Sequence, residues 1–594
     1  MYTGSDAIKK TGWAVTDYDI TRPKGVAENF GILPVEPPKQ FANGSGTEED
    51  PYLISDAEQL ALLSELSQAN TFEDTYFELT ADITLEGENN HTPIGAFACA
   101  FGGTFDGKGH TISGVHIKNA GDGSGFFAAI QGGATIKNLT LVDAHVESTN
   151  KGAVGALVGQ TNRANGNDIT ISNVYVDADV IVANGGEVGG IIGNISDKGN
   201  TSYEPGTVYI TDVVFDGSVT ATGNCVAGIV GNARMVTVEI TNALNAGKIT
   251  STGNYVAGLI AADGADSDAP QVGTGEYDEN GDEIMVKVFG DFYIENSVNI
   301  GKILGKDLVC SIASYADTDA NNTREIVNCV VVNGMAADGT SKNATAPENL
   351  TTLDDISEFI GTDATIPAGF TARAGDVAVP TGCEGAADAV IYGIGLLNGA
   401  SVRLSSPSGI RFTAIMGADY LNSFKGEGKT VSYGIIITPT DYVEEAEGVF
   451  TVEALKALGY GVTHKEINAD SCVNDPEADG YYEFTGVLAP VQEGNYTRAF
   501  SAIAYVKVVD ADGNVTYYYS DYNEDDNSRS IAEVAEKAYK DTYYEQTEKY
   551  QHALDVEVEE EVEGEMTTVT KTVYSPYTAT QRETLLGFTE LGEQ

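Results

Sequence analysis

One short pattern of apolar and polar positions recurs along the chain between residues 136 and 334. Its first half reads Ile-x-Asn followed by alternating apolar positions, as in residues 136–141 and 171–176. Its second half is a run of small and apolar residues, such as Val-Gly-Ala-Leu-Val-Gly at 154–159. The spacing is 35 residues from Asn138 to Asn173 and 39 from Asn173 to Asp212. Self-similarity at this period predicts a repeat architecture in which neighbouring units complete each other's core.

The pattern inside one unit predicts a bent strand. Ile136 lies on the opposite parity from Leu139 and Leu141, so one straight strand cannot bury all three side chains. A bend at Asn138 resolves the conflict, because asparagine tolerates the left-handed conformation of a tight corner. The second half predicts a second strand, whose small residues suit closely stacked backbones. Helical spacing is absent, so we expect a parallel β-solenoid.

The asparagine of each unit should then mark a corner that all coils share. Stacked amides at one corner can hydrogen-bond to each other along the solenoid axis, and we expect a structural ladder of this kind. Its predicted members are Asn138, Asn173, Asp212, Asn242, Asn296 and Asn328.

The segments around the repeats divide the chain into further parts. Residues 1–42 read as the end of an upstream domain and a proline-rich linker, and the repeats occupy residues 43–335. A capping box at 55–58 predicts a helix that caps the first coil. An insertion at 263–288 contains the acidic run 278–282, which reads either as a hairpin turn or as a calcium loop. Residues 336–386 read as a polar linker with a short helix near 352–360.

A second domain is predicted for residues 387–545, where runs such as 409–415 and 498–509 have the alternation of strands. Two helices interrupt these strands. One begins at Thr451 and stops at Gly459, and the other opens with the capping box Ser530 to Glu533. We therefore expect a β-sandwich-like domain with packed helices, followed by a hairpin and tail over residues 546–594.

Several motifs resemble known families. The opening at 44–54, the string at 101–112 and the Gly-apolar-apolar-Gly runs are similar to the GLUG-motif repeat proteins, over roughly residues 43–335. This resemblance implies a right-handed parallel β-helix in a secreted or surface-attached, multi-domain bacterial protein, mostly from Firmicutes. The strings at 399–404, 409–412, 495–498 and 530–535 are similar to an uncharacterised module of clostridial surface proteins. That likeness implies a surface location and no particular activity.

Charge narrows the range of partners. The 33 Lys and Arg residues against 88 Asp and Glu give a formal net charge of −55. Such a surface repels phosphate backbones, so we expect neither nucleic acid nor an anionic membrane as a partner. No apolar run is long enough for membrane insertion. The first residues lack the pattern of a secretory signal, so we expect either a fragment of a larger chain or a chain whose leader has been removed, secreted or displayed at the cell surface.

Candidate chemistry is sparse. The six histidines lack a nucleophile context, and the carboxylates do not recur at one place in successive units, so we predict no catalytic residue, no metal site and no cofactor, and leave calcium open. The six cysteines read as buried free thiols, with a bridge between Cys310 and Cys329 as the alternative. Arg403, Arg411 and Arg498 stand out in so acidic a chain. They read either as partners of carboxylates within the sandwich or as a pocket for an anion or an acidic sugar.

These observations predict a non-enzymatic, structural or adhesin-like protein of the cell exterior. The solenoid would be a stalk or display surface, and the ligand would be an extracellular glycan or a surface protein. Two alternatives remain open. One is a β-helix carbohydrate-active enzyme, either a polysaccharide lyase or a glycoside hydrolase, and the other is a non-catalytic, glycan-binding part of such an enzyme.

Overall fold

The computed structural model describes residue 41 and residues 43–589, apart from short internal gaps. The expectations for residues 1–40 and for the acidic run 278–282 lie outside the described residues. The gaps are 119–122, 150–151, 163–166, 197–205, 235, 263–270, 278–282, 288–290, 316–322, 337–346, 355, 362–363, 374–375, 387–392, 398, 427, 477–480, 521, 523, 545 and 563–564.

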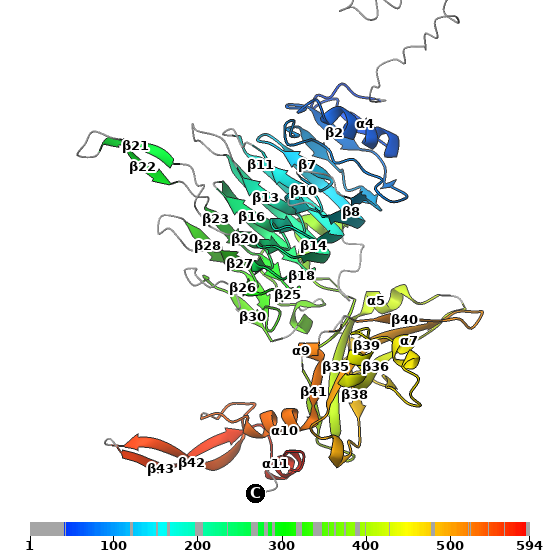
Figure 1. Cartoon of the computed structure of the whole chain (residues 1–594), viewed down its shortest axis with the longest axis vertical. Coiled ribbons are helices and arrows are strands. Elements are labelled where there is room, and N and C mark those ends of the chain that lie inside the picture. Colours follow the sequence, from blue (N-terminus) through cyan, green and yellow to red (C-terminus); the bar gives the residue numbers. More distant parts are fainter. Residues whose placement is uncertain are drawn as a thin grey trace, which may run out of the picture. The chain divides into compact units, whose positions relative to one another are not determined.

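The repeats stack as coils of parallel β-structure, which confirms the mainly-β, β-helix-like prediction (Figure 1). Each central coil has one long bent strand and two short ones, and equivalent strands of successive coils pair in three parallel sheets. The largest sheet contains β1 (Tyr52–Ile54), β2 (Tyr76–Leu79), β3 (Ile83–Thr84), β4 (Thr104–Asp106), β5 (Thr111–Ser113), β6 (His116–Lys118), β8 (Thr135–Ser148), β11 (Ile169–Val182), β14 (Thr207–Ala221), β17 (Thr237–Asn245), β18 (Lys248–Ser251), β23 (Phe292–Glu295), β24 (Val298–Asn299), β25 (Ile303–Leu304), β28 (Arg324–Val327), β29 (Val330–Val332) and β30 (Thr351–Leu353).

The two smaller parallel sheets are built from the short strands. The first contains β7 (Phe127–Ile130), β10 (Val158–Thr161), β13 (Ile192–Ser196), β16 (Val230–Arg234), β20 (Ile260–Ala262) and β27 (Ala313–Tyr315). The second contains β9 (Val154–Gly155), β12 (Val188–Gly189), β15 (Val226–Ala227), β19 (Asn254–Ala257) and β26 (Asp307–Cys310).

The coils stack in the register that the repeat pattern predicts. Ile136 pairs with Ile171, which in turn pairs with Ile210. Leu139 and Leu141 are as fully buried as Ile136, because Asn138 turns the strand with a φ of 53°. The bend therefore brings residues of opposite parity into one core.

The small-residue half of each unit differs from its prediction as one strand. It forms two short strands in different sheets, β9 and β10 in the first such unit, with a corner between them. Glycine permits this corner, because a Cβ atom on Gly155 would lie 2.4 Å from the main-chain oxygen of Val158. The small-residue run therefore forms a corner at which the backbone approaches itself too closely for a side chain.

A helix accompanies the first coils. α4 (Ala57–Ser67) buries Leu60 and Leu63, and its last residue, Ser67, accepts a 2.8 Å hydrogen bond from the backbone of Gly95. Its N-cap is Asp56 rather than the predicted Ser55, because the Asp56 carboxylate accepts from the backbone N–H of Gln59. The helix is present as predicted, but its N-cap lies one residue later in the chain than the predicted one.

The segment predicted as a linker is instead folded against the solenoid. After β30 it forms η1 (Ile356–Phe359), β31 (Phe370–Thr371), β32 (Val379–Pro380) and η2 (Thr381–Ala386). Phe359 and Val379 are buried in one cluster with Val214 and Leu244 of the solenoid strands. We call residues 364–386 the strap. The strap was missed because its apolar residues follow no period and find their partners far away in the sequence.

The insertion between the fourth and fifth asparagine corners contains a hairpin. β21 (Gln271–Tyr277) and β22 (Glu283–Lys287) pair antiparallel. The coil stacking continues past it, since Ile240 pairs with Ile294 in the same register as before.

The predicted second domain has two antiparallel sheets around a common core. One contains β33 (Ile394–Leu396), β34 (Ser401–Arg403), β35 (Gly409–Gly417) and β38 (Tyr481–Leu488). The other contains β36 (Thr430–Pro439), β37 (Lys465–Asn468), β39 (Ala499–Val509), β40 (Val515–Tyr519) and β41 (Ser528–Ser530). Phe412 and Phe484 from the first sheet pack with Ile435 and Ala504 from the second.

Short helices surround this core. They are α5 (Ala418–Ser423), α6 (Thr440–Glu445), α7 (Val452–Ala457), η3 (Glu493–Asn495), α9 (Glu524–Asn527) and α10 (Ile531–Lys540). The N-cap at Thr451 and the capping box of Ser530 and Glu533 are confirmed.

The last segment is a hairpin followed by a packed helix instead of a tail. β42 (His552–Val562) pairs antiparallel with β43 (Glu565–Ser575), as predicted. α11 (Ala579–Leu586) then places Leu585 and Phe588 in the domain core beside Ile531 of α10. This part of the chain therefore completes the second domain.

Candidate functional site

An open pocket of about 430 Å³ lies on the C-terminal domain where β36 runs into α6. Its wall is largely apolar, and Val462, at 83% exposure, projects from the rim. The residues that line it are Ile437, Pro439, Tyr442, Val462, Thr463, His464, Lys465, Leu488, Pro490, Val491, Gln492, Asn495, Arg498 and Phe500.

A layered stack of side chains forms one side of this pocket. The Arg498 guanidinium lies 5.4 Å from the ring centre of Tyr442, and the Tyr442 ring stacks on Tyr460 with centres 5.2 Å apart. The Tyr460 hydroxyl donates to both carboxylate oxygens of Glu445, which fixes the outer ring. Cation–π and aromatic contacts of this kind hold the rings in place.

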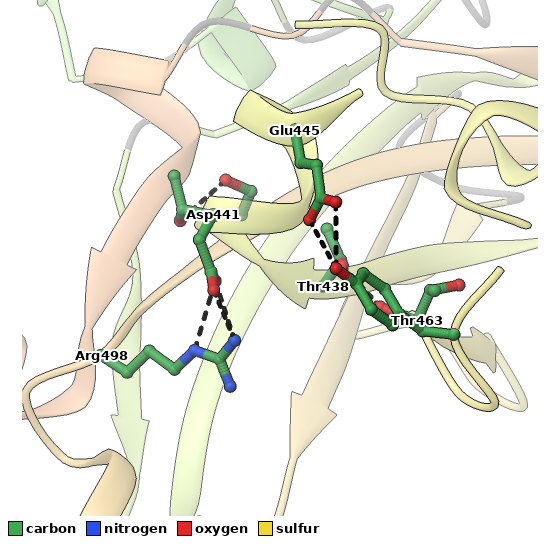
Figure 2. A network of polar contacts seen from close by, with 8 residues as sticks. Thr438, Asp441, Glu445, Thr463 and Arg498 are labelled. Carbon is green, nitrogen blue, oxygen red and sulfur yellow. Dashed lines mark hydrogen bonds and ion pairs between the residues drawn. The ribbon is translucent and has the colours of Figure 1, made fainter. Parts of the chain in front are cut away.

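The charge of Arg498 is already paired. Its Nη2 atom donates to both carboxylate oxygens of Asp441, at 2.9 and 2.7 Å, and Nε donates to one of them at 3.2 Å (Figure 2). This contact with Asp441 raises the pKa of Arg498 further above its ordinary value. The positive charge of Arg498 is therefore already balanced by a carboxylate before a ligand arrives.

Two further lining residues, Thr463 and His464, are held in place or neutral. Thr438 donates to the main-chain oxygen of Thr463 at 2.7 Å, as Figure 2 shows. Burial, followed by the charge of Lys456, lowers the pKa of His464, so its imidazole is neutral at pH 7. An apolar wall beside a fixed tyrosine ring can hold the C–H face of a sugar or an apolar peptide side chain.

The three arginines singled out in the sequence do not form one site. Arg403 and Arg411 lie on the adjacent strands β34 and β35, and Arg498 precedes β39 in the other sheet. Among the residues that the structure describes, the predicted pairing with a carboxylate is seen for Arg498 and not for the other two arginines. Arg403 and Arg411 donate to the hydroxyls of Ser405 and Ser401, at 3.1 and 2.8 Å. Arg498 lines the pocket described above and Arg403 and Arg411 do not, so a pocket for an anion or an acidic sugar at these arginines stays a prediction.

The asparagine corners are linked as a ladder over part of the solenoid. Asn173 donates to the side-chain oxygen of Asn138, and Asn242 donates to Asp212, each at 2.9 Å. Each amide donates to the preceding corner, and this order stops at Asp212 because a carboxylate has no donor. Left-handed φ values near 50° occur at all six predicted positions, Asn138, Asn173, Asp212, Asn242, Asn296 and Asn328.

The strap covers the middle of this ladder. Gly382 approaches so closely that a Cβ atom there would lie 2.2 Å from the Asn173 side-chain oxygen. Gly369 lies equally close to Asn242. These corners are thus packed against protein, which makes them part of the fold rather than a row of ligand-binding amides.

A group of carboxylates lies near the strap. The Tyr175 hydroxyl donates to Asp216 at 3.2 Å, and Arg373 forms an ion pair with the fully buried Asp376 at 3.2 Å. Desolvation, with repulsion from Asp177, raises the pKa of Asp216 to about 7. This group was missed in the sequence because its members come from two coils and the strap. No repeated spacing joins them.

The described part of the chain contains neither a metal-binding cluster nor a membrane-spanning helix. There, no group of three or more His, Cys, Asp and Glu side chains is arranged to hold a metal ion. None of the described helices has the length and apolar character needed to cross a bilayer.

Comparisons with known proteins give short matches. No protein-family model matches the chain. A segment of 128 residues, 20% of this chain, is 38% identical to Halomucin of Haloquadratum walsbyi, and 131 residues are 36% identical to a candidate Gly-rich membrane protein of Evansella cellulosilytica. The matches span 1% and 14% of the length of these two relatives.

One solved structure is also similar. It is the crystal structure of a candidate immunoglobulin A1 protease from Bacteroides ovatus, at 20% sequence identity and a TM-score of 0.40. The similarity covers 54% of this chain and 88% of that one.

Proposed function

We propose that this chain is part of an extracellular or cell-surface protein of the GLUG-motif type. In this proposal the solenoid, a right-handed β-helix, is a stalk or display element, and the C-terminal domain is a non-catalytic module that binds a glycan. The acidic composition and the similarity of one segment to a Gly-rich membrane protein support the location.

The single observation that carries the binding function is the open pocket beside Tyr442. Its apolar wall is exposed, its ring is held by Arg498 and by Tyr460, which Glu445 fixes, and the charge of Arg498 is already paired. A ring that is fixed before the ligand arrives loses little conformational entropy on binding. Pyranose rings present the flat C–H face that such a surface accepts.

The test is a glycan array probed with the purified full chain and two variants. Val462→Asp places a charge on the apolar rim at an exposed position, so the fold should survive while binding falls about tenfold or more. Tyr544→Ala removes an exposed tyrosine outside the pocket and should bind as the unmodified chain does. Equal binding by all three proteins would overturn the assignment of this pocket, and a flat array would overturn the binding function.

The same preparation also addresses the enzyme alternative. Incubation with pectin, alginate and host glycans, followed by chromatography of the products, should yield intact polymer. Shortened products would overturn the non-catalytic proposal and favour a carbohydrate-active enzyme.

A further inference from the structure

A second and larger concavity of the C-terminal domain concentrates positive charge. This groove, of about 970 Å³, lies between β34 and α10. Four cations and two carboxylates are among its lining residues, in a chain with a net charge of −55. The charged members are Arg529, Lys537, Lys540, Lys549, Glu533 and Asp541.

The carboxylates of the groove have other partners. Glu533 accepts from Ser530 in the capping box of α10. Asp541 accepts a 2.9 Å hydrogen bond from the Tyr550 hydroxyl. Lys540 is likewise engaged, since it forms an ion pair with Glu536 one turn earlier.

Three cations remain for a ligand. Among the carboxylates that the structure describes, none forms an ion pair with Arg529, Lys537 or Lys549. Lys537 and Lys549 are exposed, and Arg529 is half-buried. Cations that form no ion pair inside a concavity attract an anion, because the low-dielectric walls focus their field.

Aromatic rings complete the groove. Tyr550 and Tyr577 line it, and the Lys549 ammonium lies 5.3 Å from the ring centre of Tyr550. Burial, then the charge of Asp541, raises the pKa of Tyr577, and the charges of Lys549 and Arg411 oppose that rise. Arg411 is not a lining residue, but its Nε donates to the hydroxyl of the lining residue Ser401 at 2.8 Å, which places a further positive charge beside the groove.

We propose that this groove binds an acidic polysaccharide, with the cations taking its carboxylate or sulfate groups and the tyrosines its sugar rings. The volume is in the range of sites that enclose a small ligand or a few sugar units. A nucleic acid would bring many further phosphates against the acidic remainder of the chain, which disfavours it. The groove shares no lining residue with the pocket at Tyr442, so the proposal does not rest on that site.

The test is calorimetric titration of the full chain with oligogalacturonate at low salt. The double variant Lys537→Gln/Lys549→Gln should lose about tenfold or more in affinity, since two charge-assisted contacts are removed. The matched control Lys425→Gln/Lys429→Gln changes the net charge equally at two exposed lysines of the same domain outside the groove. The control should keep the affinity within a factor of about two.

Other probes identify the ligand class. A sulfated oligosaccharide that competes would extend the site to sulfate, while a neutral galactan should not bind. The Val462→Asp variant should retain oligogalacturonate binding, which separates this groove from the pocket of the proposed function. Absence of binding by the unmodified chain would overturn the proposal. So would equal losses in both lysine variants, or tighter binding of a single-stranded oligonucleotide.

Discussion

The thiol of Cys383 donates to the main-chain oxygen of Asp212, with 2.9 Å between sulfur and oxygen. This contact joins the strap to the solenoid corner where the side-chain ladder is interrupted. Beside it, Gly382 lies against Asn173 with no room for a side chain. Strap and ladder therefore form one packed unit, from which the first prediction follows.

Gly382→Ala should destabilise the protein. The added methyl group meets the Asn173 amide, which is held in the ladder, and overpacking of this kind costs about 1–3 kcal/mol. A lower midpoint in thermal unfolding, followed by circular dichroism, would show it. Gly461→Ala is the control, because a Cβ atom at position 461 meets nothing within 4 Å. Equal midpoints for the two variants would contradict the tight contact.

Two variants at Asn173 can separate the contribution of its hydrogen bond from that of its left-handed backbone conformation. Asn173→Ala loses the hydrogen bond to Asn138 and must also hold a left-handed φ of 54°, so we expect a loss of about 1–3 kcal/mol in the free energy of unfolding. Asn173→Gly loses only the hydrogen bond, because glycine adopts positive φ without strain. Chemical denaturation should rank the glycine variant between the parent and the alanine variant. The reverse order would show that the corner conformation is not the limiting feature.

Stability should depend on pH through Asp216. Its folded pKa, about 7, lies above the ordinary value of 3.8, so the folded state holds this proton more tightly than the unfolded state. The stabilising contribution is complete below about pH 4 and is lost as the pH rises to about 7. Burial also raises the pKa of Asp177, so this carboxyl adds to the loss of stability as the pH rises.

Asp216→Asn removes this dependence while keeping an acceptor for the backbone of Gly217. Its unfolding midpoint, relative to the parent, should therefore rise between pH 5 and pH 8. Glu86→Gln, at an exposed carboxylate of the early coils, should show no such trend. If the unfolding midpoints of Asp216→Asn and of the parent changed by the same amount over this pH range, the raised pKa of Asp216 would be contradicted.

The six cysteines should separate into two classes. All are free; Cys99 and Cys472 are half-buried and the other four are buried. Burial raises the pKa of Cys329 to about 12, and it raises that of Cys383 strongly, so their reactive thiolates are scarce at pH 8. Ellman's reagent should therefore label two thiols rapidly in the native protein and all six after denaturation. Four in total would indicate the alternative bridge between Cys310 and Cys329.

Features with a local physical cause were predictable from the sequence. Ile136 and Leu139 have opposite parity, so burying both required a bend between them. Asn138 lies there and is a residue type that adopts the left-handed conformation of a bend. The capping box at Ser530 was readable for the same reason. A similar box at Thr578 and Gln581 opens α11 and was overlooked, although its spacing is visible in the chain.

Features that depend on long-range packing were not predictable. Nothing near Arg498 indicates that its partner is Asp441, 57 residues earlier. The basic groove likewise joins β34 to α10 and to the loop that holds Lys549, which are distant in sequence. The scarcity of cations in a strongly acidic chain was a usable signal. It directed attention to Arg403, Arg411 and Arg498, although the lysines beyond residue 530 carry the same signal.

The hairpin β21–β22 shows what the solenoid tolerates. Residues 240 and 294 remain in register although the hairpin and its flanks lie between them, whereas a neighbouring pair such as 210 and 240 is joined by a plain coil. Loop length adds little to the cost of closing a corner whose ends are already fixed. This position should therefore accept a foreign peptide of comparable length in place of the hairpin, with the coils on either side left unchanged.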